Sequence, residues 1–214
     1  PEIQGITVTN GSVYVTAGNN VTAAVDADDG SVQWRRTVDA SFYNSTSEQI
    51  SAPSVAHGAV YVATDDLIDA AGSDGQVGAV HALDATDGDR IWQFQTDAEL
   101  EDPPAVGAEA VYVGGARGLM TGYSLNASTG DLRWSFETNR LPIPDPYFDA
   151  VVADGLVLFT LGDGQPRPRG SYDRVIAVES SETAPGWVPL DDEPEAPVDT
   201  VNAEPTVSIQ TDPA

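Results

Sequence analysis

Short apolar runs recur along this chain, and Gly or a small residue introduces most of them. Three runs carry Val-Tyr-Val and a fourth carries Val-Leu-Phe; they lie at residues 11–15, 58–62, 109–113 and 155–159. Runs of about five residues that are rich in Val, Tyr and Phe and are bounded by turn residues are typical of β-strands. No segment keeps a helical period, so the pattern predicts an all-β chain.

A further short strand precedes three of these runs, at residues 52–56, 103–106 and 149–152. Two more strands follow each run, so four short strands make one unit. Gly, Asp and Asn at the bends between them favour antiparallel hairpins. The pattern therefore predicts four units, and their approximate bounds are residues 5–40, 50–98, 102–140 and 147–190.

An eleven-residue pattern closes each unit. Its first residue is small, its third is Asp, Asn or Glu, its seventh is Gly in three copies, and its eleventh is Trp. The residues concerned are Ala24, Asp26, Gly30 and Trp34; Ala82, Asp84, Gly88 and Trp92; Ser124, Asn126, Gly130 and Trp134; and Ala177, Glu179 and Trp187. The fourth copy has Thr183 where the others have Gly. Every Trp of the chain lies in this register, so the repeat sets the fold.

Each position of the pattern has a physical role. The carboxylate or amide at the third position can accept hydrogen bonds from the amides of a tight turn, and Gly at the seventh suits a positive φ. The small first residue leaves room for the indole, which can lie between two sheets and donate to a backbone carbonyl. A sheet of this kind cannot bury both faces alone, so the units are expected to stack radially as a β-propeller.

The pattern Ala-x-Asp-x-x-x-Gly-x-x-x-Trp resembles the tryptophan-docking motif of quinoprotein-type, pyrroloquinoline quinone-like β-propellers, over roughly residues 5–190. The resemblance implies blades of four antiparallel strands, with each Trp packed against the neighbouring blade. Propellers of that family commonly have eight blades, whereas this chain shows four. We favour a longer parent chain; a ring completed by copies or a partner and closure by four blades are the alternatives.

Residues 1–190 are thus expected to form the propeller blades. Residues 191–214 are rich in Pro and acidic side chains, and we expect an acidic tail or the start of a further blade, with a possible strand at residues 204–209. The segments at residues 38–50, 65–78 and 162–173 lengthen individual units, and we expect them to be surface loops.

The net charge of the 214 residues is −25, from 34 acidic and 9 basic residues, and every basic residue is Arg. This charge opposes binding to nucleic acid. Molar salt shortens the Debye length to about 3 Å and screens the self-repulsion. The composition resembles that of proteins from extreme halophiles, especially haloarchaea, and implies salt cations held diffusely around the carboxylates. An ordinary acidic secreted domain is the alternative.

Four Asn-x-Ser/Thr sites suggest an extracellular or cell-surface location, although a chain rich in Ser and Thr produces some by chance. The possible glycosylation sites are Asn10, Asn20, Asn44 and Asn126. The chain begins at Pro1 without Met or an apolar leader, which we interpret as a processed or excised segment. No apolar run is long enough for a transmembrane helix.

Little in the sequence points to catalysis. Cys is absent and His57 and His81 are the only histidines, so zinc is not expected. A quinone site of the family type would need a vicinal Cys pair and a spare Trp, and every Trp is assigned to docking. The acidic segment at residues 65–74 could gather oxygen ligands for Ca²⁺, but a solvated acidic loop is the favoured interpretation. We expect no catalytic residue, metal or cofactor.

Three of the nine Arg residues, Arg167, Arg169 and Arg174, lie in or beside one segment. They could pair with nearby Asp, or they could contact an acidic partner or a second subunit. The resemblance implies a non-enzymatic scaffold, because Cys-free members such as the outer-membrane assembly lipoproteins are scaffolds. We therefore predict a protein-binding or structural propeller with a protein partner or a homo-oligomeric state. The alternatives are a quinone- or metal-dependent oxidoreductase domain and a glycan-binding propeller.

Overall fold

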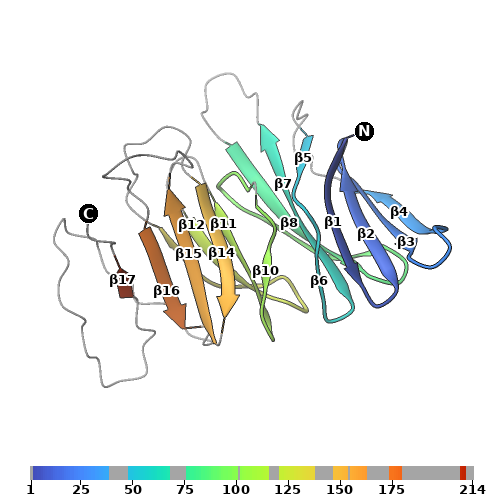
Figure 1. Cartoon of the computed structure of the whole chain (residues 1–214). Coiled ribbons are helices and arrows are strands. Elements are labelled where there is room, and N and C mark those ends of the chain that lie inside the picture. The colour runs from blue at the N-terminus through green and yellow to red at the C-terminus, as the bar shows by residue number, and fades with distance from the viewer. Residues whose placement is uncertain are drawn as a thin grey trace, which may run out of the picture.

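The structure is a computed structural model that describes residues 2–38, 48–67, 76–100, 102–115, 121–137, 147–153, 155–162, 174–179 and 208–210. All regular structure in these ranges is β, in four antiparallel sheets that follow one another along the chain (Figure 1). The prediction of an all-β chain built from antiparallel four-stranded units is confirmed.

In three sheets the strands lie in chain order, and the second sheet has two short strands, β5 and β6, that both pair with β7. The first sheet consists of β1 (Ile3–Thr9), β2 (Ser12–Ala17), β3 (Val21–Asp26) and β4 (Val32–Thr37). The second consists of β5 (Glu48–Ile50), β6 (Ser54–Ala56), β7 (Ala59–Leu67), β8 (Gln76–Asp84) and β9 (Arg90–Gln95). The third consists of β10 (Ala105–Val106), β11 (Ala110–Gly115), β12 (Thr121–Asn126) and β13 (Leu132–Glu137). The fourth consists of β14 (Tyr147–Ala153), β15 (Leu156–Gly162), β16 (Arg174–Glu179) and β17 (Ser208–Gln210).

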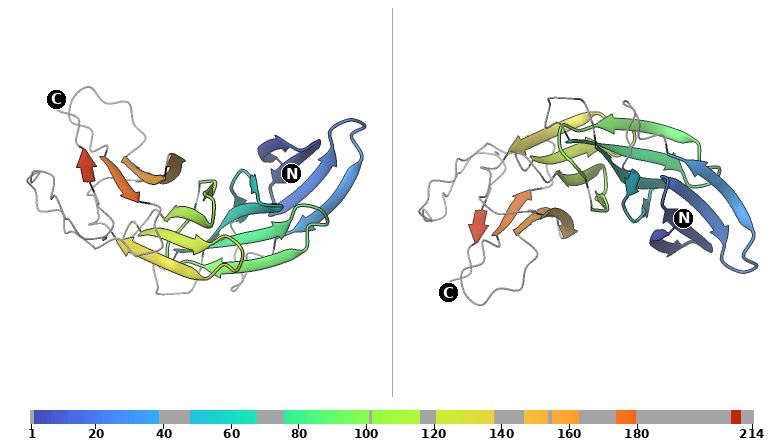
Figure 2. Two further views of the ribbon diagram at one scale, coloured as in Figure 1. Left: turned by 90° about the horizontal axis from the view of Figure 1, so that it is seen from below. Right: turned by 90° about the horizontal axis from the view of Figure 1, so that it is seen from above.

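The four sheets form an open arc (Figure 2). Strands β1, β6, β10 and β14 line its concave side and contact one another in that order. Strands β4, β9 and β13 lie on the convex side. The described residues therefore form an arc of blades whose first and fourth sheets are the two ends.

The Val-Tyr-Val runs explain how the sheets stack. Val60 and Val62 are fully buried against Tyr14 and Trp34 of the first sheet. Tyr61 lies between them in sequence, points to the other face, and packs with the third sheet. The same alternation recurs in the third sheet, so each central sheet buries both faces.

Two segments that we predicted to be surface loops contain paired strands. Part of residues 38–50 forms β5, which pairs with β7. Part of residues 65–78 extends the β7–β8 hairpin, which is paired from Ala59–Asp84 as far as Leu67–Gln76. Asp65 is consequently buried. The acidic side chains suggested exposure to solvent. Because Asp65 and Asp66 continue β7, however, their position is set by the pairing of β7 with β8.

The possible strand at residues 204–209 is found at Ser208–Gln210. It does not begin a further blade, because β17 pairs with β16 and completes the fourth sheet. Residues 180–207 separate the two strands, and so long a connection leaves no local sequence signal for the pairing. The strand expected to carry Trp187 lies outside the described residues.

Candidate functional site: the contacts between successive sheets

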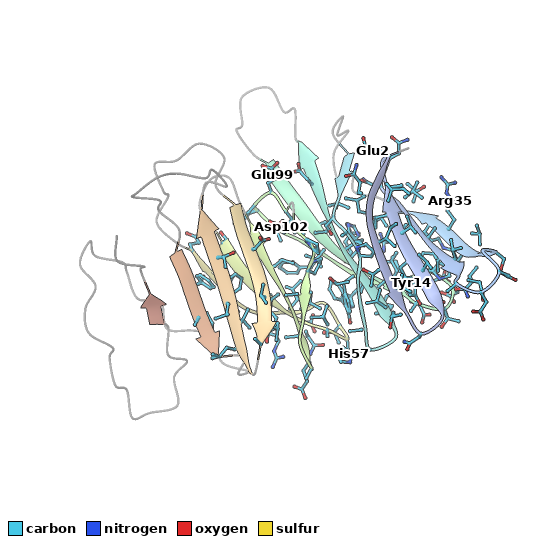
Figure 3. The ribbon with its side chains drawn as sticks, viewed as in Figure 1. Glu2, Tyr14, Arg35, His57, Glu99 and Asp102 are labelled. Atoms are coloured by element: carbon cyan, nitrogen blue, oxygen red, sulfur yellow. The ribbon has the colours of Figure 1, made fainter. Side chains whose placement is uncertain are left out.

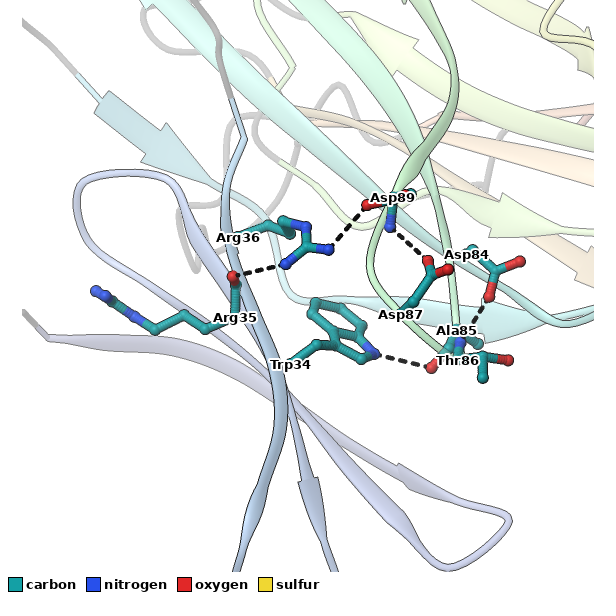
Figure 4. Close-up of polar contacts among 8 residues, drawn as sticks. All are labelled: Trp34, Arg35, Arg36, Asp84, Ala85, Thr86, Asp87 and Asp89. Carbon is teal, nitrogen blue, oxygen red and sulfur yellow. Dashed lines mark hydrogen bonds and ion pairs between the residues drawn. The ribbon is translucent and has the colours of Figure 1, made fainter.

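The indole of Trp34 joins the first sheet to the second (Figure 4). Its Nε1–H donates to the carbonyl oxygen of Ala85 at 2.9 Å. The hydroxyl of Tyr14, which packs against Trp34 with ring centroids 6.2 Å apart, donates to the same oxygen at 3.3 Å. The contact thus combines a buried apolar surface with two satisfied donors.

The same arrangement joins the second sheet to the third. Trp92 donates through Nε1 to the carbonyl oxygen of Ala127 at 2.9 Å, and the Tyr61 hydroxyl donates to that oxygen at 3.2 Å. The two rings lie 5.9 Å apart. The acceptor in both junctions is the residue after the third position of the repeat in the following unit.

A tight turn presents each acceptor. In the first unit the Asp26 carboxylate accepts hydrogen bonds from the amides of Asp28 and Asp29, and the Asp26 carbonyl accepts from Gly30. Asn126 makes the equivalent bonds in the third unit, and Asp84 accepts from Thr86 in the second. The seventh residue of each copy adopts a positive φ, at Gly30, Gly88 and Gly130.

Each indole also lies against a glycine of the next sheet, and this close contact requires glycine there. A Cβ atom on Gly88 would lie 2.5 Å from Cε3 of Trp34, and one on Gly130 would lie 2.7 Å from Cδ2 of Trp92. Glycine is therefore needed at these two positions both for its backbone conformation and for the close approach of the indole. The sequence suggested only the first reason.

The small first residue of each copy is the cross-strand neighbour of the Trp of its own unit. The register pairs Ala24 with Trp34, Ala82 with Trp92, and Ser124 with Trp134. These small residues are buried. A small side chain on the neighbouring strand leaves the space that the indole ring covers.

Trp134 is buried among aromatic rings of the third and fourth sheets, including Tyr112, Phe136 and Phe159. Its Nε1 has no hydrogen-bond partner among the described residues. The residue equivalent to Ala85 and Ala127 is Ser180, which lies outside them. Ala177 is in β16, the Glu179 side chain is not described, and Thr183 and Trp187 lie outside the described residues.

One ion pair links the first junction. A guanidinium nitrogen of Arg36 lies 2.8 Å from a carboxylate oxygen of Asp89, and both side chains are exposed (Figure 4). An exposed pair of this kind contributes little to stability because water screens it. Apolar burial and the indole hydrogen bond therefore dominate the junction.

Two contacts between polar side chains lie within the second and third sheets, away from the repeat turns. His81 is fully buried, and its Nε2 lies 3.0 Å from the hydroxyl oxygen of Thr64. The Tyr123 hydroxyl donates to the carboxylate of Asp97. Burial and the negative charge of Asp97 raise the pKa of Tyr123 above its usual range. The sequence did not predict these two contacts, because the partners lie 17 and 26 residues apart in the chain.

His57 lies at the opposite end of the second sheet from Glu99 (Figure 3). It is exposed, has a φ of +52°, and its Nε2 lies 2.8 Å from the carbonyl oxygen of Gly107. His81, in contrast, is fully buried and contacts Thr64, so the two histidines have different surroundings and different partners. Among the described residues, no three His, Asp or Glu side chains gather as metal ligands would.

The possible glycosylation sites differ in exposure. Asn10 lies exposed in the β1–β2 turn, and Asn126 is half-buried with its carbonyl oxygen engaged in the repeat turn. Asn20 is buried, so the packing shown here has no room for a glycan on it. Asn44 lies outside the described residues.

The arginine segment is largely outside the described residues. Arg167 and Arg169 lie there, and Arg174 begins β16 with a side chain that is not described. In the part of the chain that the structure covers, no helix has the length and apolar character to cross a membrane.

Comparison with known proteins places these features in a family. The sequence profile described as outer membrane protein assembly factor BamB matches residues 2–137 and 69–178. BamB of Yersinia pestis is 27% identical over 165 residues, which is 72% of this chain and 37% of the relative. The chain therefore spans little more than a third of the length of this curated relative.

Solved structures with the same fold include BamB from Moraxella catarrhalis, with a TM-score of 0.58 and 18% identity over 83% of this chain and 50% of that one. A quinohemoprotein alcohol dehydrogenase from Pseudomonas putida gives a TM-score of 0.59 and 18% identity over 83% of this chain and 32% of that one. At such identities these likenesses show the propeller fold alone.

Proposed function

Because this chain belongs to the family of outer membrane protein assembly factor BamB, we propose that it is a non-enzymatic, protein-binding scaffold. The observation that carries the proposal is the extent of the family match, which runs from the first sheet to β16. The relative from Yersinia pestis is named as an assembly factor, and assembly factors act through contacts with other proteins.

The contacts between the sheets support structural roles for the Trp and His side chains that a catalytic site could otherwise use. Trp34 and Trp92 are engaged in the junctions between sheets, and we propose the same docking role for Trp134 and Trp187. The other pattern residues hold the turns or leave room for the indoles. His81 is buried and bonded to Thr64, so it offers no accessible base.

We further propose that the protein works at the cell surface of a halophile. Its net charge of −25 and the absence of Lys support this proposal, because carboxylates remain hydrated when salt is abundant. Of the three possible glycosylation sites that the structure describes, Asn10 is the exposed one, and we propose that it carries a glycan.

The contact surface that we propose for a partner includes Arg167, Arg169 and Arg174. They concentrate positive charge between β15 and β16 on an otherwise acidic molecule. Guanidinium groups bind carboxylates in a bidentate manner, so an acidic protein surface is the matching partner.

The experiment is affinity purification of the tagged full chain from its source cells after mild cross-linking. We expect a stoichiometric partner with the unmodified chain and its loss with the double variant Arg167→Ser and Arg169→Ser. The matched control is Arg35→Ser, which removes an exposed arginine from β4. Retention of the partner by the double variant would contradict the proposed surface.

A second measurement tests the non-enzymatic part. The purified chain is titrated with pyrroloquinoline quinone and Ca²⁺ and followed by visible absorbance and bound-metal analysis. We expect neither saturable quinone binding nor a stoichiometric metal. Saturable binding of the quinone would contradict the scaffold proposal and favour the oxidoreductase alternative.

A further inference from the structure

A layer of polar side chains is buried between the first and second sheets, beside the apolar cluster that contains Trp34. Its members, each with an exposed fraction of 0%, are Thr16, Thr22, Thr64 and His81. The residue two positions away in each strand belongs to the apolar cluster; these residues are Tyr14, Ala24, Val62 and Leu83. Since alternate residues of a strand share a face, all four members point into the same junction. We call them the polar layer.

Hydrogen bonds hold three members of the polar layer in place. The hydroxyl of Thr16 in the first sheet donates to the carbonyl oxygen of Ser51 in the second unit at 2.9 Å. In the second sheet the hydroxyl oxygen of Thr64 lies 3.0 Å from Nε2 of His81. The layer is therefore a bonded contact between the two sheets, and Thr22 is the member whose role these bonds do not explain.

Two buried oxygens at this junction have no hydrogen-bond partner among the described residues. One is Oγ1 of Thr22, which is the cross-strand neighbour of Thr16. The other is Oδ1 of Asn20, a residue that is 3% exposed. The backbone carbonyl of Asn20 accepts a hydrogen bond from Val38, a member of the apolar cluster between these sheets. Buried polar atoms of folded proteins almost always have a partner, and ordered water provides it where protein groups do not.

The polarity is specific to the first junction. In the second sheet the repeat has Ala63 and Val80 where the first sheet has Thr16 and Thr22. Both belong to the apolar cluster between the second and third sheets. The same fold thus accepts apolar side chains at these two positions, so the threonines are not needed to form the strands.

The first junction also contains less aromatic volume at this level. In the second junction Phe94 packs edge-on against Tyr123, with ring centroids 6.2 Å apart. The repeat has Arg36 in the place of Phe94 and His81 in the place of Tyr123. The guanidinium of Arg36 lies at the surface with Asp89, and an imidazole is smaller than a phenol. This exchange removes ring volume from the layer and favours a small polar ligand beside Thr22.

We propose that the polar layer binds an internal water molecule between the first and second sheets. A buried water needs roughly two to four polar partners. Oγ1 of Thr22 and Oδ1 of Asn20 are two of them, and the hydroxyl of Thr16, which donates to Ser51 and can still accept, is the third.

A metal cation fits this position less well than water. The polar layer contains no carboxylate, and hard cations prefer several charged or carbonyl oxygens. The strand register also pairs Thr22 with Arg36, which places a positive charge on the neighbouring strand. A neutral ligand that can both donate and accept hydrogen bonds matches these surroundings.

Deuterium magnetic relaxation dispersion of the full chain in concentrated KCl tests the proposal, because it counts water molecules that tumble with the protein. We expect Thr22→Val to hold one long-lived water fewer than the unmodified chain. Thr22→Ser, which keeps the hydroxyl, should retain that water. Nuclear Overhauser effects from water to the Thr22 methyl group give the same answer without a substitution.

The sign of a stability change gives a second comparison. Thr22→Val introduces the residue found at Val80 and should lower the folding equilibrium constant about threefold or more, because the water loses a partner. The matched control is Ser124→Ala, which introduces the residue found at Ala82. The Ser124 hydroxyl is also buried without a partner among the described residues, but Trp134 is its cross-strand neighbour and covers it. Ser124→Ala should therefore change neither the water count nor lower the stability.

Three results would overturn the proposal. The first is the same number of long-lived waters in the unmodified chain and Thr22→Val, or no Overhauser effect from water at the Thr22 methyl group. The second is a gain in stability from Thr22→Val, which would show a hydroxyl buried without any partner. The third is stabilisation by KCl but not by tetramethylammonium chloride that disappears in Thr22→Val, which would show a bound cation. The proposal depends on contacts between the first two sheets and not on the scaffold function, so the two can fail separately.

Discussion

The six-membered ring of Trp34 lies directly over Gly88, with space for no more than a hydrogen atom on the glycine Cα. The two residues belong to successive repeats, and the indole also donates to Ala85 in the same turn. One turn therefore serves as both a steric and a hydrogen-bonding receptor for the preceding blade. Disturbing that receptor should destabilise the arc more than disturbing an equally strained turn elsewhere.

The first prediction compares two glycines of the second sheet. Gly58→Ala should cost about 1 kcal/mol, because Gly58 has a φ of +75° but open space. Gly88→Ala should cost roughly 2–4 kcal/mol, because the same strain is joined by overpacking against Trp34. Urea unfolding at dilute chain concentration measures both values. Equal losses of unfolding free energy in the two variants would show that the indole can move away from the added methyl group at no energetic cost.

The second prediction separates packing from hydrogen bonding at Trp92. Trp92→Ala should destabilise the chain by roughly 3–5 kcal/mol through loss of a large buried side chain. Trp92→Phe should cost less, because it keeps most of the apolar contact while leaving the Ala127 carbonyl with only Tyr61 as donor. A loss from Phe as large as that from Ala would show that the hydrogen bond, rather than the apolar contact, stabilises the junction.

The third prediction concerns the fourth repeat. Trp187→Ala should destabilise less than Trp92→Ala, because the turn of its own copy has Thr183 where the other copies have a glycine with positive φ, and Pro185 lies close to it in sequence. The same urea titration provides the comparison. Equal losses would show that the fourth copy docks as firmly as the second.

The fourth prediction concerns salt. The net charge of −25 should make the melting temperature higher in about 3 M KCl than in about 0.1 M KCl. Screening of carboxylate repulsion is the cause. Circular dichroism at fixed chain concentration records both midpoints. An unchanged midpoint, or a higher one at low salt, would contradict the halophilic origin that we propose.

The fifth prediction concerns alkaline pH. Burial and Asp97 raise the pKa of Tyr123 in the folded chain above the value near 10 of an exposed tyrosine. The folded state then holds a proton that the unfolded state releases, so the contribution of Tyr123 to the unfolding free energy is constant below about pH 10 and falls as the pH rises further.

Urea unfolding across the alkaline range, with absorbance of tyrosinate, checks this sign. Tyr123→Phe should be less stable at neutral pH, because the hydrogen bond to Asp97 is lost, but its stability should fall less steeply above about pH 10. If the unfolding free energy of the variant falls as steeply with pH as that of the unmodified chain, Tyr123 is not the cause of the fall.

Much of the fold could be predicted from local sequence. The apolar run Val60-Tyr61-Val62 predicts a strand, and both faces of that strand are buried against neighbouring sheets. The spacing from Asp84 through Gly88 to Trp92 predicts a turn followed by a strand, which the backbone bonds show. These features lie within a few residues of one another, so short-range geometry is enough to specify them.

Other features depend on residues that come together only in the folded chain. The pairing of β16 with Ser208–Gln210 spans residues 180–207, and the contact of His81 with Thr64 joins the interior of two strands. Polar side chains in such places look like surface residues in the sequence. Their burial follows from strand register and from what packs over the sheet.

Gly30 and Gly88 show where the sequence alone stops being informative. Both follow an Asp by four positions, both precede a Trp by four, and both adopt the same positive φ, as their common pattern predicts. Only the tertiary structure shows that an indole covers Gly88, whereas none of the described residues lies within 4 Å of a Cβ on Gly30. The turn is determined by its own residues, whereas the contact made to it depends on the sheet that packs against it.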